Sequence, residues 1–170
     1  MHLLTAQAGA LQQDGEAIDL GQSSGDIVFV SAADSELALI AGAVDRAAAT
    51  GVRLANLLRL SHNLSVDLWI EKTAQHARLV VVRLLGGAAY WTYGVDQLTV
   101  LAASGRFQLA LLPGEAIPDP SLETRSTVSA VDLRRLHGLF TAGGPENADA
   151  ILAALKDVAV GPPSPLRGGN

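Results

Sequence analysis

The sequence predicts an α/β fold, in which a mostly parallel, flavodoxin-like sheet of about five strands forms the middle of a three-layer sandwich, followed by C-terminal helices. Apolar runs alternate with amphipathic helical patterns between residues 26 and 114. The two strongest runs, 26–34 and 78–87, are apolar at successive positions rather than at every second one. This pattern is typical of central parallel strands that are covered on both faces.

Five segments are expected to form strands. Residues 26–34 (DIVFVSAAD) and 78–87 (RLVVVRLLGG) are rich in β-branched and aliphatic residues and end in small ones. The weaker candidates are 2–6, as a short opening strand, 52–58 and 106–114. Connections by helices between these runs favour right-handed crossovers and a parallel sheet.

Helical periodicity fills the gaps between the strands. The clearest helix is 35–51, with Asp34 placed to cap its start and Gly51 to end it. A second helix is expected over 64–77, with Ser65 as a candidate cap, and a third over 93–105. Residues 115–129 have the composition of a polar loop, and two further helices are predicted over 131–140 and 145–158.

The chain has the length of one ordinary domain. With 170 residues it should bury roughly 68 to 70% of the surface that the unfolded chain exposes. We assign 1–158 to one flavodoxin-like α/β domain. Residues 159–170 are assigned to a linker or tail, because three prolines and three glycines fall within the last ten positions.

Composition excludes several classes of partner. The net charge is −5 and no basic run is present, so nucleic acid is not expected as a partner. The longest apolar runs stop well short of the roughly 20 residues that span a bilayer, so no membrane association is expected. The chain has no cysteine, which excludes disulfides and thiolate metal sites, and a cytoplasmic location is predicted.

Local motifs for catalysis and cofactors are lacking. Neither a GxGxxG fingerprint nor a phosphate-binding GxxxxGK[ST] loop occurs, and the loop after the opening segment offers only Thr5 as a hydroxyl for a flavin phosphate. The histidines show no ligand spacing, so no metal site is assigned. No GxSxG motif occurs and no Ser/His/Asp triad can be assigned without geometry, so no catalytic residue is assigned either. Of the four histidines, His62 could lie at a ligand edge, although a structural role is the simpler interpretation; the others are His2, His76 and His137.

The stretch RLLGGAAYWTYG (83–94) is the main candidate site. Three of the chain's seven aromatic residues lie within four positions, directly after two glycines and at the carboxyl end of a predicted central strand. Ligands bind at this edge in open parallel sheets. The candidates for a ligand or domain interface are Gly86, Gly87, Tyr90, Trp91, Tyr93 and His62. The alternative is that the aromatic rings fold back and seal the end of the sheet.

Several blocks of sequence resemble the amino-terminal region of the large subunit of aerobic cobaltochelatases of the CobN type, which is related to the large subunit of magnesium chelatases. The resemblance extends from residue 1 to about residue 156. It is carried by 19–37 (DLGQSSGDIVFVSAADSEL), 65–73 (SVDLWIEKT), 83–94 (RLLGGAAYWTYG), 111–115 (LLPGE), 126–136 (STVSAVDLRRL) and 143–152 (GGPENADAIL). Two positions differ from the expected pattern, Asn63 and Thr92, where proline is expected.

The resemblance implies a role in ATP-dependent cobalt insertion. Such a subunit is a nitrogen–metal bond-forming ligase component of cobalamin biosynthesis, which binds the corrin precursor hydrogenobyrinic acid a,c-diamide and receives cobalt(II). Two ATPase-type partner subunits hydrolyse the ATP. The family's subunit is several times longer and its catalytic region lies downstream, so this chain is expected to be a non-catalytic fragment or module without a cofactor of its own. Its expected partners are the remaining domains of that subunit.

Two alternatives stay open. The first is a non-catalytic flavodoxin-like binding or interaction domain unrelated to chelation. A phosphorelay receiver is a specific version of it, but the last predicted strand and its loop, LALLPGE (109–115), lack the expected lysine. The second is a magnesium-inserting relative, which ranks behind because 83–94 resembles the cobalt type.

Overall fold

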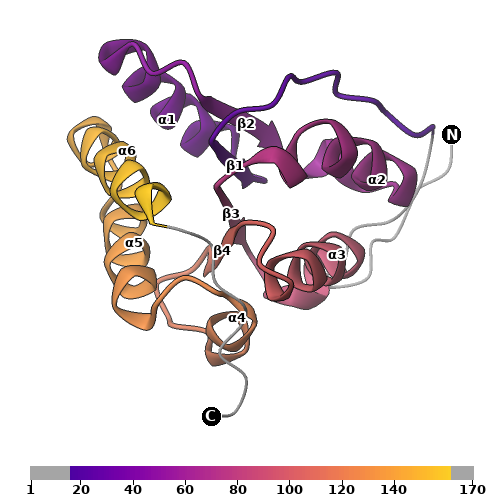
Figure 1. Ribbon diagram of the computed structural model, residues 1–170. Helices are drawn as coiled ribbons and strands as arrows, with labels where there is room; N and C mark the ends of the chain where they lie inside the picture. Colours follow the sequence, from indigo (N-terminus) through magenta and orange to yellow (C-terminus); the bar gives the residue numbers. More distant parts are fainter. Residues whose placement is uncertain (1–15, 162–170) are drawn as a thin grey trace, which may run out of the picture.

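The computed structural model describes residues 16–161 and places four parallel strands in one sheet (Figure 1). The strand order is β2-β1-β3-β4, which matches the first four positions of the flavodoxin-like order 2-1-3-4-5. The strands are β1 (Ile27–Ser31), β2 (Val52–Asn56), β3 (Leu79–Leu84) and β4 (Gln108–Pro113). The predicted fold class is confirmed, while the expected opening strand at 2–6 lies outside the described residues.

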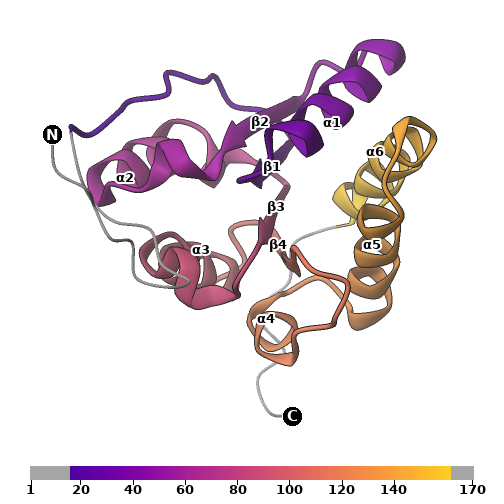
Figure 2. The ribbon, with the colours of Figure 1, turned by 180° about the vertical axis from the view of Figure 1, so that it is seen from behind.

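Helices cover both faces of the sheet. Figures 1 and 2 agree that α2 and α3 lie on one face and that α1, α5 and α6 lie on the other, with α4 near β4. The helices are α1 (Asp34–Ala47), α2 (Asn63–Lys72), α3 (Thr92–Ala103), α4 (Pro120–Arg125), α5 (Ala130–Ala142) and α6 (Pro145–Val160). The described residues also include three short 3-10 helices, η1 (Leu57–Leu60), η2 (Ala74–His76) and η3 (Ala88–Trp91).

The two central strands, β1 and β3, are buried at every position. Alternate side chains enter two separate apolar cores, because successive residues of a strand point to opposite faces. Val80 and Val82 pack on the α2 and α3 side, and Phe29 and Val81 pack on the side of α1, α5 and α6. Burying an aliphatic or aromatic side chain of this size contributes about 1.5–3 kcal/mol, so both helix layers are needed.

The boundaries of α1 differ from the sequence prediction. Its N-cap is Ala33, and Asp34 is the first helical residue, whose Oδ1 accepts a hydrogen bond from Asn56 Nδ2 (2.7 Å). The helix ends at Ala47, and its C-cap is Ala48, which adopts φ 51°, rather than Gly51. The Gly51 carbonyl instead accepts from the Ile27 amide (3.0 Å) at the start of β1. Both residues that were expected to delimit the helix, Asp34 and Gly51, therefore make tertiary hydrogen bonds instead.

The predicted cap of α2 and the predicted loop at 115–129 also need correction. His62 caps α2, whereas Ser65 is buried and its Oγ accepts from the Ile18 amide (2.7 Å). The loop contains the short helix α4, whose first turn is capped by Asp119. Asp119 Oδ1 accepts from the amides of Ser121 and Leu122, at 3.0 and 3.3 Å.

Both edges of the sheet are covered by the chain itself. On the free edge of β4, the Leu109 amide donates to Thr127 Oγ1 (2.8 Å) and the Leu111 amide donates to Ser126 Oγ (2.9 Å). The next outward position is Pro113, which has no amide hydrogen. At the opposite edge, Gln22 Nε2 donates to the carbonyl of Leu54 in β2 (2.6 Å). Side-chain hydroxyls thus occupy the place beside β4 that a fifth strand would take.

The C-terminal helix ends at Val160, two residues beyond the domain boundary assigned from sequence. The assignment of residues 159–170 to a linker or tail stays a prediction, because 162–170 lie outside the described residues. Within 16–161, no helix is long and apolar enough to cross a membrane.

The edge cover of β4 predicts an asymmetry between two serines. Ser126→Ala removes the acceptor of the buried Leu111 amide, and we expect a loss of about 1–3 kcal/mol in the free energy of unfolding. Ser121→Ala, at an exposed position in the first turn of α4, should change the free energy of unfolding by less than about 0.5 kcal/mol. Urea denaturation of both variants checks this, and equal effects would show that the hydroxyl cover does not stabilise β4.

Candidate functional site

The turns that follow β3 and β4 form the centre of the carboxyl edge of the sheet. The Gly86 amide donates to Glu115 Oε1 (3.3 Å), which links the two turns. Gly86 and Gly87 adopt φ values of 94° and 77°, a region that strongly favours glycine. A Cβ on Gly114 would lie 3.1 Å from the Leu85 backbone, so these turns approach closely. The two predicted glycines therefore shape the turn at the place where a parallel sheet binds ligands.

Trp91 closes one end of the sheet. Its side chain is 3% exposed and its Nε1 donates to the carbonyl of Leu60 (2.8 Å). Its ring lies 6.0 Å from the ring of Trp69, tilted by 58°. A Cβ on Gly94 would lie 2.1 Å from the Trp91 ring, so only glycine leaves room for it one turn into α3. Trp91 is therefore core, and it presents no flat face to a ligand.

The two tyrosines stay partly exposed. Tyr90 packs against the margin of the core, and Tyr93 does the same from the first turn of α3. The Tyr93 hydroxyl donates to Asp67 Oδ1 of α2 (2.6 Å), which joins the two helices on this face. This hydrogen bond raises the pKa of Tyr93 above its ordinary value, with smaller contributions from burial and from the negative charge of Asp67.

His62 has a structural task on the neighbouring turn. It is half-buried, and its Nδ1 accepts from the Leu64 amide (3.1 Å) at the start of α2. The hydrogen bond from Trp91 to Leu60 ties this turn to the aromatic turn after β3. The two positions where proline was expected, Asn63 and Thr92, are each the first residue of a helix, where proline is favoured.

A buried ion pair at this edge was not predicted. Arg83 is 7% exposed and its Nη2 donates to Glu36 Oε2 (3.1 Å) across the point where the strand order reverses. Its Nη1 donates to the Pro113 carbonyl, and its guanidinium lies 4.9 Å from the Phe140 ring centroid. Ser31 Oγ donates to Glu36 Oε1 (2.9 Å). The one sequence feature that could have indicated this ion pair is Arg83 itself, a charged residue within the otherwise apolar strand β3.

A cavity of about 460 Å³ lies beside the carboxyl end of β4, between α4 and α5. Its buried walls are apolar, and they include Leu111, Leu112, Pro113 and Leu133. Its polar lining includes Asp119, Glu123, Arg134, His137 and Thr141. No local pattern in the sequence indicates this cavity, because it depends on how α4 and α5 pack beside β4.

Two hydrogen bonds hold the polar lining in place. His137 Nε2 donates to the Glu115 carbonyl (2.7 Å), and Arg134 Nη2 donates to Glu123 Oε1 (3.3 Å). The two basic groups thus have acidic or carbonyl partners from the turn after β4 or from α4. A cavity of this size with an apolar wall and a few polar groups is suited to binding rather than to acid–base chemistry.

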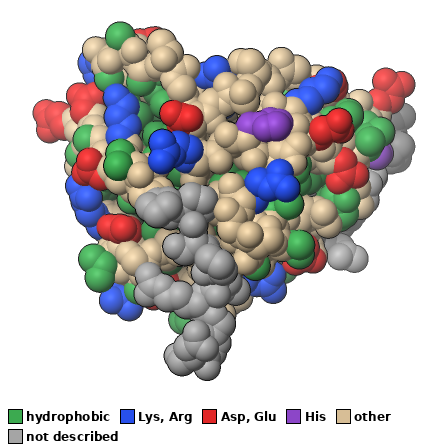
Figure 3. Space-filling model, viewed as in Figure 1, with side chains coloured by type: hydrophobic (Ala, Val, Ile, Leu, Met, Phe, Trp, Pro, Cys, Tyr) green, Lys and Arg blue, Asp and Glu red, His purple; other side chains and the backbone are tan. Residues whose placement is uncertain are grey.

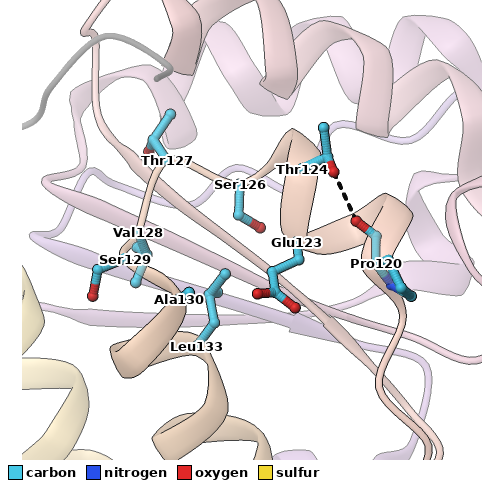
Figure 4. Close-up of a pocket in the computed structure, with 9 residues that line it drawn as sticks. All are labelled: Pro120, Glu123, Thr124, Ser126, Thr127, Val128, Ser129, Ala130 and Leu133. Atoms are coloured by element: carbon cyan, nitrogen blue, oxygen red, sulfur yellow. Dashed lines mark hydrogen bonds between the residues drawn. The ribbon is translucent and has the colours of Figure 1, made fainter. Parts of the chain in front are cut away.

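A second cavity of about 410 Å³ shares Glu123 and Leu133 with the first (Figure 4). It lies along the segment that covers β4, and Ser126 and Thr127 line it. The Thr124 hydroxyl, which also lines it, donates to the Pro120 carbonyl (2.9 Å). Most of its polar groups are thus already used to hold α4 and the edge of β4.

Charge is dispersed on the face that Figure 3 shows, where acidic and basic side chains are interspersed. The exposed ion pairs include Arg46 with Asp149 and Lys72 with Asp19. Within residues 16–161, no group of three or more His, Asp or Glu side chains is arranged to hold a metal ion.

Comparison with known proteins identifies relatives that align with most of this chain. No family model matches it. The aerobic cobaltochelatase subunit CobN of a Sinorhizobium species is 50% identical over 153 residues, and that of Pseudomonas aeruginosa is 37% identical over 164 residues. These alignments cover 89% and 95% of the chain. The chain is homologous to a segment of CobN. The resemblance inferred from the sequence blocks is thereby confirmed.

A solved structure agrees with the CobN relationship. The catalytic subunit of cobaltochelatase from Mycobacterium tuberculosis matches 85% of the chain with a TM-score of 0.61 and 28% identity. The chain covers 11% of that protein, and only 12% and 13% of the two CobN relatives. The relatives therefore contain several times more polypeptide than the chain described here.

The Trp91 environment predicts opposite effects at two helical glycines. Gly94→Ala should lower the free energy of unfolding by about 1–3 kcal/mol, because its Cβ would collide with the Trp91 ring. Gly138→Ala, in α5, meets nothing within 4 Å and should raise it by about 0.5–1 kcal/mol. Denaturation followed by tryptophan fluorescence measures both. Destabilisation of the same size by the two alanines would contradict the packing described.

The Tyr93 hydrogen bond predicts a shifted titration. In a Tyr90→Phe variant, the one remaining tyrosine should ionise above its ordinary pKa of about 10, and Asp67→Asn should lower that pKa. Because the folded state favours the protonated phenol, this contribution to stability is complete below pH of about 10 and disappears as pH rises through the folded-state pKa. Ultraviolet absorbance of the phenolate follows the titration. An unchanged midpoint in Asp67→Asn would exclude the interaction.

Proposed function

We propose that this chain is a module of a CobN-type cobaltochelatase, which inserts cobalt(II) into hydrogenobyrinic acid a,c-diamide during aerobic cobalamin biosynthesis. The observation that carries the proposal is 50% identity to CobN over 153 residues. A match of this length includes the core, both sheet edges and the turns of the carboxyl edge. ATP hydrolysis by ATPase-type partner subunits supplies the energy for insertion in the proposed complex, which works in the cytoplasm.

The module itself is proposed to be non-catalytic. Metal insertion needs bases that take the pyrrole protons and ligands that deliver the cobalt ion. In this chain, the imidazoles of His62 and His137 make hydrogen bonds that hold turns in place, and Arg83 is paired with Glu36. These contacts support a structural role, in which the module's main partners are the remaining domains of the subunit.

The second candidate is a flavodoxin-like interaction domain that does not serve chelation. It is favoured by the strand order and by the exposed, uncharged turn after β3. This candidate shares the binding role of the module but differs in its partner. A functional exchange with CobN separates the two.

The exchange experiment replaces the matching segment of Pseudomonas aeruginosa CobN by this chain. We expect the chimaera to insert cobalt when it is mixed with the ATPase subunits, ATP and the corrin precursor, whereas CobN without the segment should lose most activity. The 170-residue chain should yield no cobalt corrin in place of CobN. The absorbance spectrum of the corrin measures the product.

Re-insertion of the relative's own segment is the matched control for this exchange. A soluble, folded chimaera without activity would contradict the assignment to a chelatase. Cobalt insertion by the chain alone with the ATPase subunits would contradict its non-catalytic role.

A further inference from the structure

Large apolar side chains are exposed at the carboxyl edge. Leu58 and Leu64 follow β2, Leu85 follows β3, and Ile117 follows β4. Their exposed fractions are 51%, 50%, 60% and 77%. The carboxyl ends of parallel strands meet at one edge of a sheet, so these four residues, here called the edge patch, belong to one side of the molecule. Large exposed apolar surfaces are typical of interaction sites.

The segment that begins at Leu85, residues 85–94, has the composition of an interface core. Residues 85–94 include no charged side chain, and they contain the partly exposed rings of Tyr90 and Tyr93. Interface cores are depleted in charge and enriched in aromatic residues. Trp91 anchors the segment from inside, so the turn is already ordered before a partner binds.

Gly138 gives an independent indication on the same edge. It lies in the interior of α5, where glycine lowers helix stability relative to alanine. A Cβ at this position would meet nothing within 4 Å among the described residues, so packing within 16–161 does not require glycine. Gly138 also lines the 460 Å³ cavity beside β4. A glycine there leaves the α5 backbone accessible to a group that enters the cavity from outside.

We propose that the edge patch and this cavity form the docking surface for the remainder of a CobN-type polypeptide, one apolar side chain of which enters the cavity over Gly138. The inference rests on the proposed function and adds a binding surface to it. The relatives supply the occupant, because the chain accounts for only 12% and 13% of their length.

The observations favour a protein over a small ionic ligand. The edge patch extends over the turns after three of the four strands of the described sheet. The polar groups of the cavity already have partners within the domain, which does not favour recruitment of a small ion: Glu123 pairs with Arg134, Asp119 caps α4, and His137 donates to the Glu115 carbonyl. An apolar side chain in a pocket with such a paired polar rim resembles the anchor of a protein interface.

The test measures binding in trans between this chain and a CobN polypeptide that lacks the matching segment. Leu85→Asp and Ile117→Asp should each raise Kd at least tenfold, because each places a charge in the docked apolar surface. Val131→Asp is the matched control, since Val131 is 73% exposed but lies in the first turn of α5, away from the edge patch. Its Kd should equal that of the unchanged chain.

All three aspartate variants replace exposed side chains, and their melting temperatures should stay close to that of the unchanged chain. Folded Leu85→Asp and Ile117→Asp variants that bind as tightly as Val131→Asp would overturn the proposal. Absence of binding by the unchanged chain would overturn it too. If Leu85→Asp and Ile117→Asp dock normally but weaken the binding of the corrin precursor to the chimaera, the edge patch contacts the macrocycle instead, which would also overturn the proposal.

Substitutions of Gly138 test the cavity separately. Gly138→Ala should melt at a higher temperature than the unchanged chain and yet dock more weakly, because its methyl group occupies space needed by the incoming side chain. Gly138→Leu should fill more of the cavity and weaken docking further. Docking that is unaffected by both substitutions would exclude the cavity from the surface.

Docking and chelation fail independently in this design. A chimaera that inserts cobalt with Leu85→Asp and Ile117→Asp in place, and whose module still docks in trans, contradicts the docking surface and leaves the chelatase assignment intact. A module that docks through the edge patch in a chimaera without activity contradicts the chelatase assignment alone.

Discussion

Burial of the two central strands on both faces determines how the other helices and strands are arranged. Every side chain of β1 and β3 is enclosed, so helices must cover both sides of the sheet and the connections must cross over. The chain also covers its own edges, with the Gln22 segment at β2 and the Ser126 segment at β4. Both faces and parts of both edges of the sheet are therefore covered by elements within residues 16–161. The carboxyl edge is the part of this framework where turns, a cavity and exposed apolar side chains come together.

The same packing holds the turns of that edge in place. Trp91 fills the end of one core and donates to Leu60, which joins the turn after β3 to the turn after β2. On the other face, Arg83 joins β3 to α1 through Glu36 and to the end of β4 through the Pro113 carbonyl. A buried ion pair of this kind contributes little net stability but fixes the relative positions of the elements that it joins, which is our hypothesis for its role here. The turns of the carboxyl edge are therefore held from both sides of the sheet.

The sequence was sufficient to predict what depends on local pattern. Continuous apolar runs gave β1 and β3, and helical periodicity gave α1, α3, α5 and α6 to within a few residues. Helix ends were predicted less well, because Asp34 and Gly51 make tertiary hydrogen bonds that no local rule contains. The aromatic stretch was correctly predicted to lie at the carboxyl edge of the sheet. The burial of Trp91 could not be predicted, because it depends on contacts with Gly94 and Trp69 that form only on folding. The cavity over Gly138 has the same origin, since it exists only between packed helices and a strand end.

If residues 16–161 enclose their own core and the carboxyl edge is the docking surface, only that edge should change when the chain is joined to the rest of CobN. Amide hydrogen exchange, compared between the 170-residue chain and the CobN chimaera, measures this. We expect the amides of β1 and β3 to be equally protected in both, with added protection in the chimaera confined to the turns that contain Leu58, Leu85 and Ile117. Unprotected β3 amides in the chain alone, or added protection spread over the amino edge and the outer helix faces, would contradict the account.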